Sequence, residues 1–325
     1  MPRALVIGGT LFMGRALVEQ LLERGDEVVV MHRGGGTPFG DRVGEIRCDR
    51  NDIPSVEAAL EDETFDVVYD NVYDWERGTT GEQVAAAALA ASPGLRRYVF
   101  MSSVAVYSSG LDHDENDLLT TAADPNDYNR NKAASERALF ELHREKGIPV
   151  TTLRPAFVYG RYNPFDREAF FWDRILADRP VIIPEDGQTP MQWVLSDDVV
   201  RAAILAAEKD VAVGNAYNIA PYPPITQIEW VQACARTAGK EAKLARVPRK
   251  RIQDAGGQLF VPPFYFGVYL DLPPLTVLPD RARADLGLEL TPLDEGLRET
   301  FLWYKQQNRP RPDFSWEDEL LATVS

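Results

Sequence analysis

The alternation of short apolar runs with longer amphipathic stretches constrains this chain more than any other feature. The apolar runs are rich in β-branched residues and predict strands at 4–8, 27–31, 45–48, 66–70, 97–102 and 149–153. Helical patterns lie between several of them, notably at 12–24, 79–91 and 126–146. Apolar strands separated by helices predict a parallel sheet that is covered on both faces. Runs at 180–183 and 215–220 are candidates for later strands, with a helix from Asp197 to about Glu208 between them.

The segment GGTLFMG (8–14) follows the first predicted strand and opens the first predicted helix. Gly8 allows a tight turn, and Gly14 allows the helix to pack closely on the sheet. The helix N-terminus then directs free N–H groups and a partial positive charge toward a pyrophosphate. Leu11 stands where such turns usually have their middle glycine, but its side chain can point away if its φ is negative, and Gly9 relaxes the turn. Alone, this segment indicates either a dinucleotide site or a purely structural turn.

A second motif decides between these two interpretations. Tyr128 and Lys132 are four residues apart in the pattern of a helix, so both side chains face the same side. An ammonium beside a phenol stabilises the phenolate, which makes the tyrosine usable as an acid or a base. Ser103 follows the fifth predicted strand and can hydrogen-bond the same reacting oxygen. After a glycine turn and with this serine in place, a merely solvated Tyr–Lys pair is the less favoured interpretation.

With these motifs the chain resembles the extended short-chain dehydrogenase/reductase family, which includes nucleotide-sugar epimerases and dehydratases. The resemblance runs over nearly the whole length and also includes "CD" (48–49), "SSVAVY" (102–107), "LRPAFVYG" (153–160), "VLSDDVVRAAILA" (194–206) and the segment 280–304. It implies that Ser103, Tyr128 and Lys132 carry catalysis and that Asp49 contacts adenine. Its variant glycine turn is similar to that of an atypical subgroup whose members have been compared with sugar dehydratases, isoflavone reductases and RNA-binding proteins.

The expected fold class is therefore α/β, a Rossmann-type doubly wound parallel sheet with a smaller, discontinuous α+β C-terminal substrate lobe. The dinucleotide-binding domain is predicted at 1–154 plus about 191–220, and the substrate lobe at about 155–190 plus 221–325. The predicted cofactor contacts are Gly8, Gly9, Thr10, Leu11, Phe12, Met13, Gly14, His32, Arg33, Asp49, Lys132 and Pro155.

The end of the second predicted strand bears on the choice of cofactor. NAD-preferring relatives place an acid there that accepts hydrogen bonds from the ribose hydroxyls, whereas this chain has His32 followed by Arg33. With no carboxylate to repel a 2′-phosphate and a guanidinium to bind it, NADP is the preferred prediction and NAD the alternative. The competing interpretation is that Arg33 stacks on adenine or points into water.

Other departures narrow the chemistry that the resemblance implies. Val104 and Ala105 stand where the 4,6-dehydratases of the family carry an Asp–Glu pair, and an apolar pair cannot remove protons. Oxidation–reduction and 4-epimerisation through a transient ketone remain. Met191 and about Val268 align with the arginines that hold the nucleotide diphosphate in UDP-sugar epimerases. Arginines that could bind the diphosphate in their place are Arg161, Arg249 and Arg251. A cluster of aromatic side chains either lines a substrate pocket or packs the core of the second lobe: Phe260, Phe264, Tyr265, Phe266 and Tyr269.

Composition disfavours several other classes of function. The 325 residues include 50 acidic and 35 basic side chains, and the net charge of −15 repels nucleic acid and anionic membranes. No apolar run approaches the roughly 20 residues of a membrane-spanning helix. The two cysteines and three histidines have no metal-binding spacing, so we expect a cytoplasmic protein without a metal.

The leading prediction is an NAD(P)-dependent enzyme that moves hydride between nicotinamide and a carbinol carbon of a sugar or nucleotide sugar. The alternatives are an NADPH-dependent reductase of a non-nucleotide, possibly aromatic, carbonyl compound and a non-catalytic cofactor-sensing or RNA-binding protein. A homodimer is also expected, because family members commonly pair through two helices, here about 79–91 and 126–146. The first contains VAAAALAA (84–91), whose small side chains, with Ala87 at the centre, let helices approach closely.

Overall fold

The computed structural model describes residues 1–165, 167–257, 270 and 272–323, and its centre is a seven-stranded parallel sheet. The strands are ordered β3-β2-β1-β4-β5-β7-β12 across this sheet. Their bounds are β1 Arg3–Ile7, β2 Glu27–His32, β3 Gly44–Arg47, β4 Val67–Asp70, β5 Arg97–Met101, β7 Val150–Pro155 and β12 Asn215–Ile219. The order reverses between β1 and β4, where the carboxyl ends of the strands leave a crevice for a ligand in doubly wound folds.

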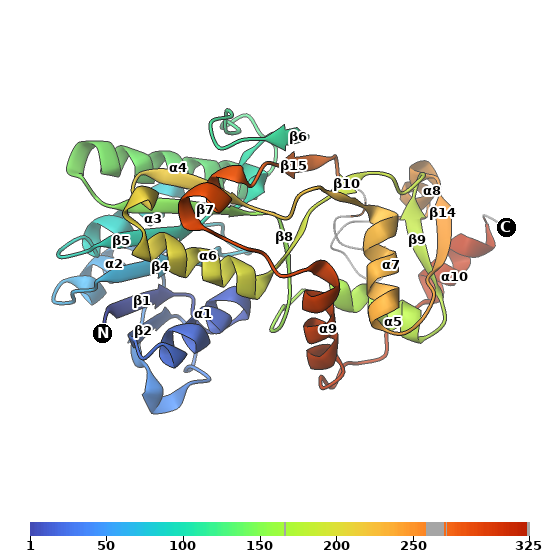
Figure 1. The fold of residues 1–325 in the computed structure, drawn as a ribbon, viewed down its shortest axis with the longest axis horizontal. Helices are drawn as coiled ribbons and strands as arrows, with labels where there is room; N and C mark the ends of the chain where they lie inside the picture. The colour runs from blue at the N-terminus through green and yellow to red at the C-terminus, as the bar shows by residue number, and fades with distance from the viewer. Residues whose placement is uncertain (166, 258–269, 271, 324–325) are drawn as a thin grey trace.

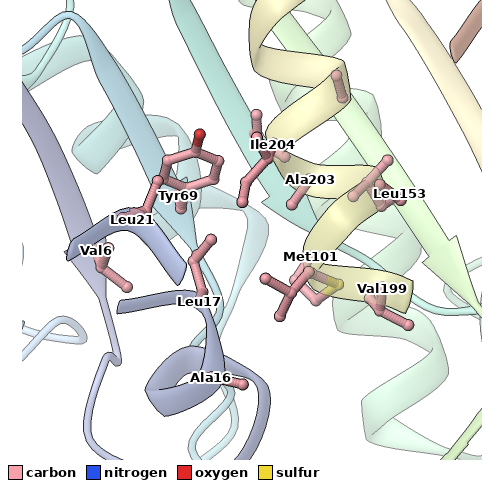
Figure 2. Close-up of a cluster of buried hydrophobic side chains, with 14 of the residues drawn as sticks. Val6, Ala16, Leu17, Leu21, Tyr69, Met101, Leu153, Val199, Ala203 and Ile204 are labelled. Carbon is pink, nitrogen blue, oxygen red and sulfur yellow. The ribbon is translucent and has the colours of Figure 1, made fainter. Parts of the chain in front are cut away.

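Helices cover both faces of the sheet (Figure 1). Helices α1 (Phe12–Glu23) and α6 (Ser196–Glu208) lie on one face. On the other face lie α2 (Ile53–Leu60), α3 (Gly81–Ala90) and α4 (Asp127–Lys146), whose buried side chains share one apolar core with the strands. Figure 2 shows the first of these cores, where side chains of α1 and α6 meet the strands. Its labelled members are Val6, Ala16, Leu17, Leu21, Tyr69, Met101, Leu153, Val199, Ala203 and Ile204.

A smaller lobe lies beside the sheet (Figure 1). Its apolar core gathers side chains of α5 (Glu168–Leu176), α7 (Gln227–Thr237) and α9 (Leu293–Tyr304). The remaining helices are α8 (Arg249–Asp254) and α10 (Ser315–Ala322), with short helical turns η1 (Gly40–Arg42), η2 (Val104–Val106), η3 (Asp210–Ala212) and the π-helical η4 (Ala282–Leu286). Among the described residues, four two-stranded sheets join β14 (Lys243–Val247) to β9 (Pro180–Pro184), β11 (Trp193–Leu195) to β8 (Phe157–Tyr159), β10 (Pro190–Met191) to β13 (Ile225–Thr226), and β15 (Leu275–Val277) to β6 (Gly110–His113).

The predicted α/β fold with a parallel, doubly wound sheet is confirmed, and one detail differs from the sequence analysis. The run at 180–183, a candidate strand, forms β9, which pairs with β14. Residues 275–288 were assigned to the second lobe, but β15 pairs with β6, and Ala282 and Leu286 pack into the core between α1, α6 and the sheet. The division into two domains stays a prediction.

The structure corrects the expected position of Ala87. This residue is fully buried in the core between α3 and the central sheet, so it does not lie on a surface that is open to a partner. On the same helix, Leu89 is 41% exposed. The described part of the chain contains no helix that is long and apolar enough to cross a membrane.

Candidate active site

The glycine turn after β1 is shaped by two close backbone approaches. Gly8 has a φ of +87°, which favours glycine, and a Cβ added to Gly14 would lie 1.9 Å from the carbonyl oxygen of Gly8. Leu11 is extended, with φ −132°, and is 65% exposed, so its side chain points away as its negative φ allows. The first turn of α1 contains no acidic residue. The turn therefore leaves room for a pyrophosphate beside an unopposed positive helix end.

An ion cluster forms where the adenosine end of a dinucleotide is expected. His32 is buried, with its Nε2 atom 3.3 Å from Glu45 Oε2, and Arg33 donates to Asp74 Oδ2 at 2.7 Å. Arg77 donates to both Asp74 and Asp49, at 2.8 Å in each case. Burial alone would raise the pKa of Asp74, but hydrogen bonds from the Arg77 guanidinium and nearby backbone N–H groups lower it to about 2. Asp74 therefore stays ionised and offsets the charge of Arg33.

Helix α4 carries the predicted tyrosine and lysine. Asn126 caps the helix by accepting a hydrogen bond from the Tyr128 N–H at 2.9 Å. The Lys132 side chain is buried, and its Nζ atom donates to the Met101 carbonyl oxygen at 2.6 Å and lies 5.9 Å from the centroid of the Tyr128 ring. Ser103 caps η2, which packs against α4, and its Oγ atom accepts a hydrogen bond from the Ala105 N–H at 3.1 Å. These elements meet beyond the carboxyl end of β5.

Burial sets the protonation equilibrium of Lys132. It lowers the pKa of this ammonium to about 8, although the charge of Asp70 opposes the effect. Asp70 ends β4 and is itself fully buried, where it accepts hydrogen bonds from Arg50 and, at 2.7 Å, from the Tyr98 hydroxyl. The sequence analysis missed this network, although a carboxylate at the end of an otherwise apolar strand is the signal that could have found it.

The sequence analysis also missed a group of aromatic rings around Tyr128. Trp75 stacks on the Tyr128 ring, with the centroids 4.9 Å apart and the planes 16° from parallel. Tyr73 meets the same phenol edge-on at 4.8 Å, and Phe165 meets Trp75 edge-on at 5.7 Å. Tyr73 and Trp75 come from the loop after β4, and Phe165 comes from the segment between β8 and α5.

Residues considered for diphosphate binding are placed as follows. Met191 is buried in the apolar core of the smaller lobe. Arg161 pairs with Asp197 at 3.0 Å, and Arg251 donates to the Thr323 carbonyl oxygen at 2.5 Å. The main-chain N–H of Arg249 donates to Glu185 at 2.8 Å. Val268 and the aromatic residues Phe260, Phe264, Tyr265, Phe266 and Tyr269 lie outside the described residues.

The remaining predicted cofactor contacts lie along the same edge of the sheet. Thr10, Phe12 and Met13 are in the glycine turn or begin α1, and Phe12 has a φ of +44°. Pro155 is the last residue of β7 and is buried. Among the described residues, no group of three or more histidine, cysteine or acidic side chains is arranged to hold a metal ion.

Comparison with known proteins agrees with this architecture. Residues 4–220 match the profile of the NAD dependent epimerase/dehydratase family. The chloroplast stem-loop binding protein of 41 kDa b from Arabidopsis thaliana is 30% identical over 255 residues, which are 73% of this chain and 63% of that protein. A trifunctional UDP-glucose 4,6-dehydratase/UDP-4-keto-6-deoxy-D-glucose 3,5-epimerase/UDP-4-keto-L-rhamnose-reductase from the same plant is 25% identical over 75% of this chain and 33% of its own length.

The chain thus spans less than two thirds of the length of these two relatives. Among solved structures, UDP-glucose 4-epimerase from Thermotoga maritima superposes with a TM-score of 0.75 at 21% identity, covering 94% of this chain and 99% of that one. This likeness shows the fold. The match over residues 4–220 shows the family, and the chain belongs to the NAD-dependent epimerase/dehydratase family.

Proposed function

We propose that this protein is an NAD(P)-dependent enzyme that oxidises or reduces a carbinol carbon of a sugar or nucleotide sugar, either as an epimerase or as an oxidoreductase. The observation that carries the proposal is the buried Lys132 ammonium, held by the Met101 carbonyl oxygen one helical turn from Tyr128. A buried cation costs free energy, and in this proposal it stabilises the Tyr128 phenolate.

The glycine turn at the start of α1 fits the pyrophosphate of a dinucleotide. A Cβ at residue 14 would fill the space against Gly8, and the N-terminus of α1 carries no opposing carboxylate in its first turn. Gly8, Gly9 and the residues that follow would hold the pyrophosphate, and Asp49 and Arg33 would border the adenosine. When bound, the nicotinamide supplies or accepts the hydride.

Each predicted catalytic side chain has a separate task in this proposal. Tyr128 exchanges the proton of the substrate hydroxyl at its Oη atom, and Ser103 orients the reacting oxygen through its hydroxyl. Lys132 stabilises the phenolate while it is charged and borders the nicotinamide ribose. Since its pKa is lowered to about 8, Lys132 is mostly protonated at neutral pH and loses its charge in mildly alkaline solution. We therefore expect turnover to fall as the pH rises above about 8.

Tyr128→Phe tests the proposed mechanism. The change removes the proton-exchanging oxygen and keeps the ring that stacks on Trp75, so we expect turnover to fall by about 10²–10⁴-fold while cofactor binding and the unfolding transition persist. Tyr73→Phe is the matched control, because it removes a neighbouring phenol oxygen that contacts Asn131 at 3.3 Å. Turnover of Tyr128→Phe at the wild-type rate would refute the assignment.

The preference between NADP and NAD is a finer proposal. Arg33 supports NADP because its guanidinium can bind a 2′-phosphate. Its ion pair with Asp74 at 2.7 Å reduces that advantage, since the same carboxylate repels the phosphate. We therefore expect NADPH to bind only moderately more tightly than NADH, and Arg33→Asp to reverse the order in equilibrium titrations. Equal affinities that do not change with this substitution would contradict the proposal.

A homodimer and a cytoplasmic location complete the proposal. Helices α3 and α4 pack on each other, and Leu89 is a large apolar side chain that stays 41% exposed on α3. Cys48 and Cys234 are both buried and free, which suits a reducing compartment. RNA binding, which the name of one relative suggests, is disfavoured by the net charge of −15.

A further inference from the structure

Two exposed rings border the proposed catalytic tyrosine. Trp75 is 62% exposed and Phe165 is 38% exposed, and both belong to the group of rings that surrounds Tyr128. We call Trp75 and Phe165 the aromatic wall. A tryptophan gains more from burial than almost any other side chain, so an indole that leaves most of its surface in water beside a reacting group has an unused binding face.

The loop that carries Trp75 is held in place. The Asp74 carboxylate accepts hydrogen bonds from the N–H groups of Glu76 at 3.0 Å and Arg77 at 3.1 Å, and the Asp74 N–H donates to Thr79 Oγ1 at 3.0 Å. Tyr73 also meets Trp75 edge-on, with the ring centroids 5.1 Å apart. The indole is therefore presented by a fixed turn, and a ligand that stacks on it does not have to order the loop first.

The second ring is held by a buried cation. The Arg167 guanidinium lies 5.3 Å from the Phe165 centroid and 5.9 Å from that of Phe12, at the start of α1. This side chain is 9% exposed and donates to the Val158 carbonyl oxygen. Through these contacts the aromatic wall is continuous with the glycine turn. The aromatic wall therefore borders both the glycine turn and Tyr128.

We propose that the aromatic wall is the substrate-recognition surface and selects a compound that carries, next to its reacting carbon, a ring with an apolar face. This inference rests on the proposed function, because it takes Tyr128 as the group that exchanges the proton. Trp75 and Phe165 carry no charge, so they recognise the face of a ring through contact area rather than through ionic groups. Both an aryl carbonyl compound and a pyranose present such a face.

The test measures ring binding by the cofactor-loaded enzyme with and without the indole. The probes are acetophenone, methyl glucopyranoside and UDP-glucose, with butanone as an acyclic carbonyl compound, and binding is followed by calorimetry and by saturation-transfer NMR. We expect at least one ring probe to bind. Trp75→Ala should weaken the affinity for that probe roughly tenfold, which corresponds to the loss of one aromatic stacking contact and of the area it buries. Trp75→Phe should keep most of the affinity.

The control is Leu118→Ala, which truncates an apolar side chain that is 91% exposed and should leave every affinity unchanged. The binding of butanone should not depend on residue 75. If acetophenone is the tighter ring probe the substrate is an aryl compound, and if a glucoside is tighter it is a sugar.

Three results would overturn the inference. These are ring affinities that Trp75→Ala does not change, a failure of every ring probe to bind, and binding of UDP-glucose alone with no dependence on Trp75. In each case the proposed function stands, provided that cofactor binding and the effect of Tyr128→Phe are observed. A wild-type protein that binds neither NADH nor NADPH would refute the proposed function itself.

Discussion

Lys132→Met should make the fold more stable while it removes activity. The Lys132 ammonium is 4% exposed and faces the ring of Phe100 with its Nζ atom 4.7 Å from the centroid. Burial lowers its pKa from the ordinary 10.5 to about 8, even with the opposing charge of Asp70. Methionine has a similar length and no charge, so the substitution removes the disfavoured group without leaving a large cavity.

The expected change in the free energy of unfolding follows from two opposing terms. One pKa unit corresponds to about 1.4 kcal/mol, so the fall from 10.5 to about 8 means that the charged Lys132 costs about 3 kcal/mol at neutral pH. Methionine also loses the hydrogen bond to the Met101 carbonyl oxygen, which is worth about 1.5–3 kcal/mol because its donor is charged. The variant should therefore be more stable by about 1 kcal/mol.

The stabilising effect of Lys132→Met should depend on pH. Between about pH 8 and pH 10.5 the unfolded chain keeps the Lys132 proton and the folded chain has lost it. Since the unfolded state then binds more protons, the contribution of this group to wild-type stability rises with pH across that window. The free-energy cost of burying the charged Lys132 is complete below about pH 8 and disappears toward pH 10.5. The extra stability of Lys132→Met over the wild type should therefore shrink over the same range.

Chemical denaturation from neutral to alkaline pH measures this difference. The control is Lys146→Met, which changes an exposed lysine in the last turn of the same helix and should give nearly equal stabilities throughout. A Lys132→Met protein that is less stable than the wild type at neutral pH, or an advantage that does not vary with pH, would refute the reasoning.

Three further substitutions test other parts of the structure. Gly14→Ala places a Cβ 1.9 Å from a backbone oxygen and should abolish cofactor binding and cost about 1–3 kcal/mol of stability in a thermal melt, whereas Gly35→Ala, with nothing within 4 Å, should do neither. Leu89→Glu puts a like charge on both sides of the proposed interface and should give a monomer by light scattering; a wild-type monomer would refute the dimer. Asp74→Asn removes the charge that offsets Arg33 and should raise the ratio of NADPH to NADH affinity; an unchanged ratio would show that Arg33 does not contact the phosphate.

Local patterns in the sequence were sufficient to predict most of the central sheet. Most strands of that sheet coincide with an apolar run, because parallel strands buried on both faces have little else in them, whereas the edge strand β3 is largely exposed. Helix α2 (Ile53–Leu60) was not predicted, since it is only eight residues long and contains a proline in its first turn. The pairing of β6 with β15 joins residues about 165 positions apart in sequence, and no local pattern specifies such a partner.

Only part of the candidate site could be predicted from local patterns in the sequence. The spacing of Tyr128 and Lys132 placed them on one helix face, because helical periodicity fixes that relation without tertiary structure. The ion pair between Arg33 and Asp74 joins the loops after β2 and β4, and the stacking of Trp75 on Tyr128 joins the second of these loops to helix α4. Loops are brought together by the sheet beneath them, so their contacts follow from the topology and not from any short stretch of residues.

The loop after β4 links the two ends of the proposed cofactor groove. Asp74 pairs with Arg33 at the adenosine end, and the next residue, Trp75, stacks on Tyr128 at the reacting end. Adjacent residues in a turn point in different directions, so one fixed turn can serve both ends at once. Its position depends on hydrogen bonds from main-chain N–H groups to the Asp74 carboxylate, which are strongest while that group is ionised. Under the two proposals, cofactor choice and substrate recognition depend on the same short segment, so a change that loosens it should alter both together.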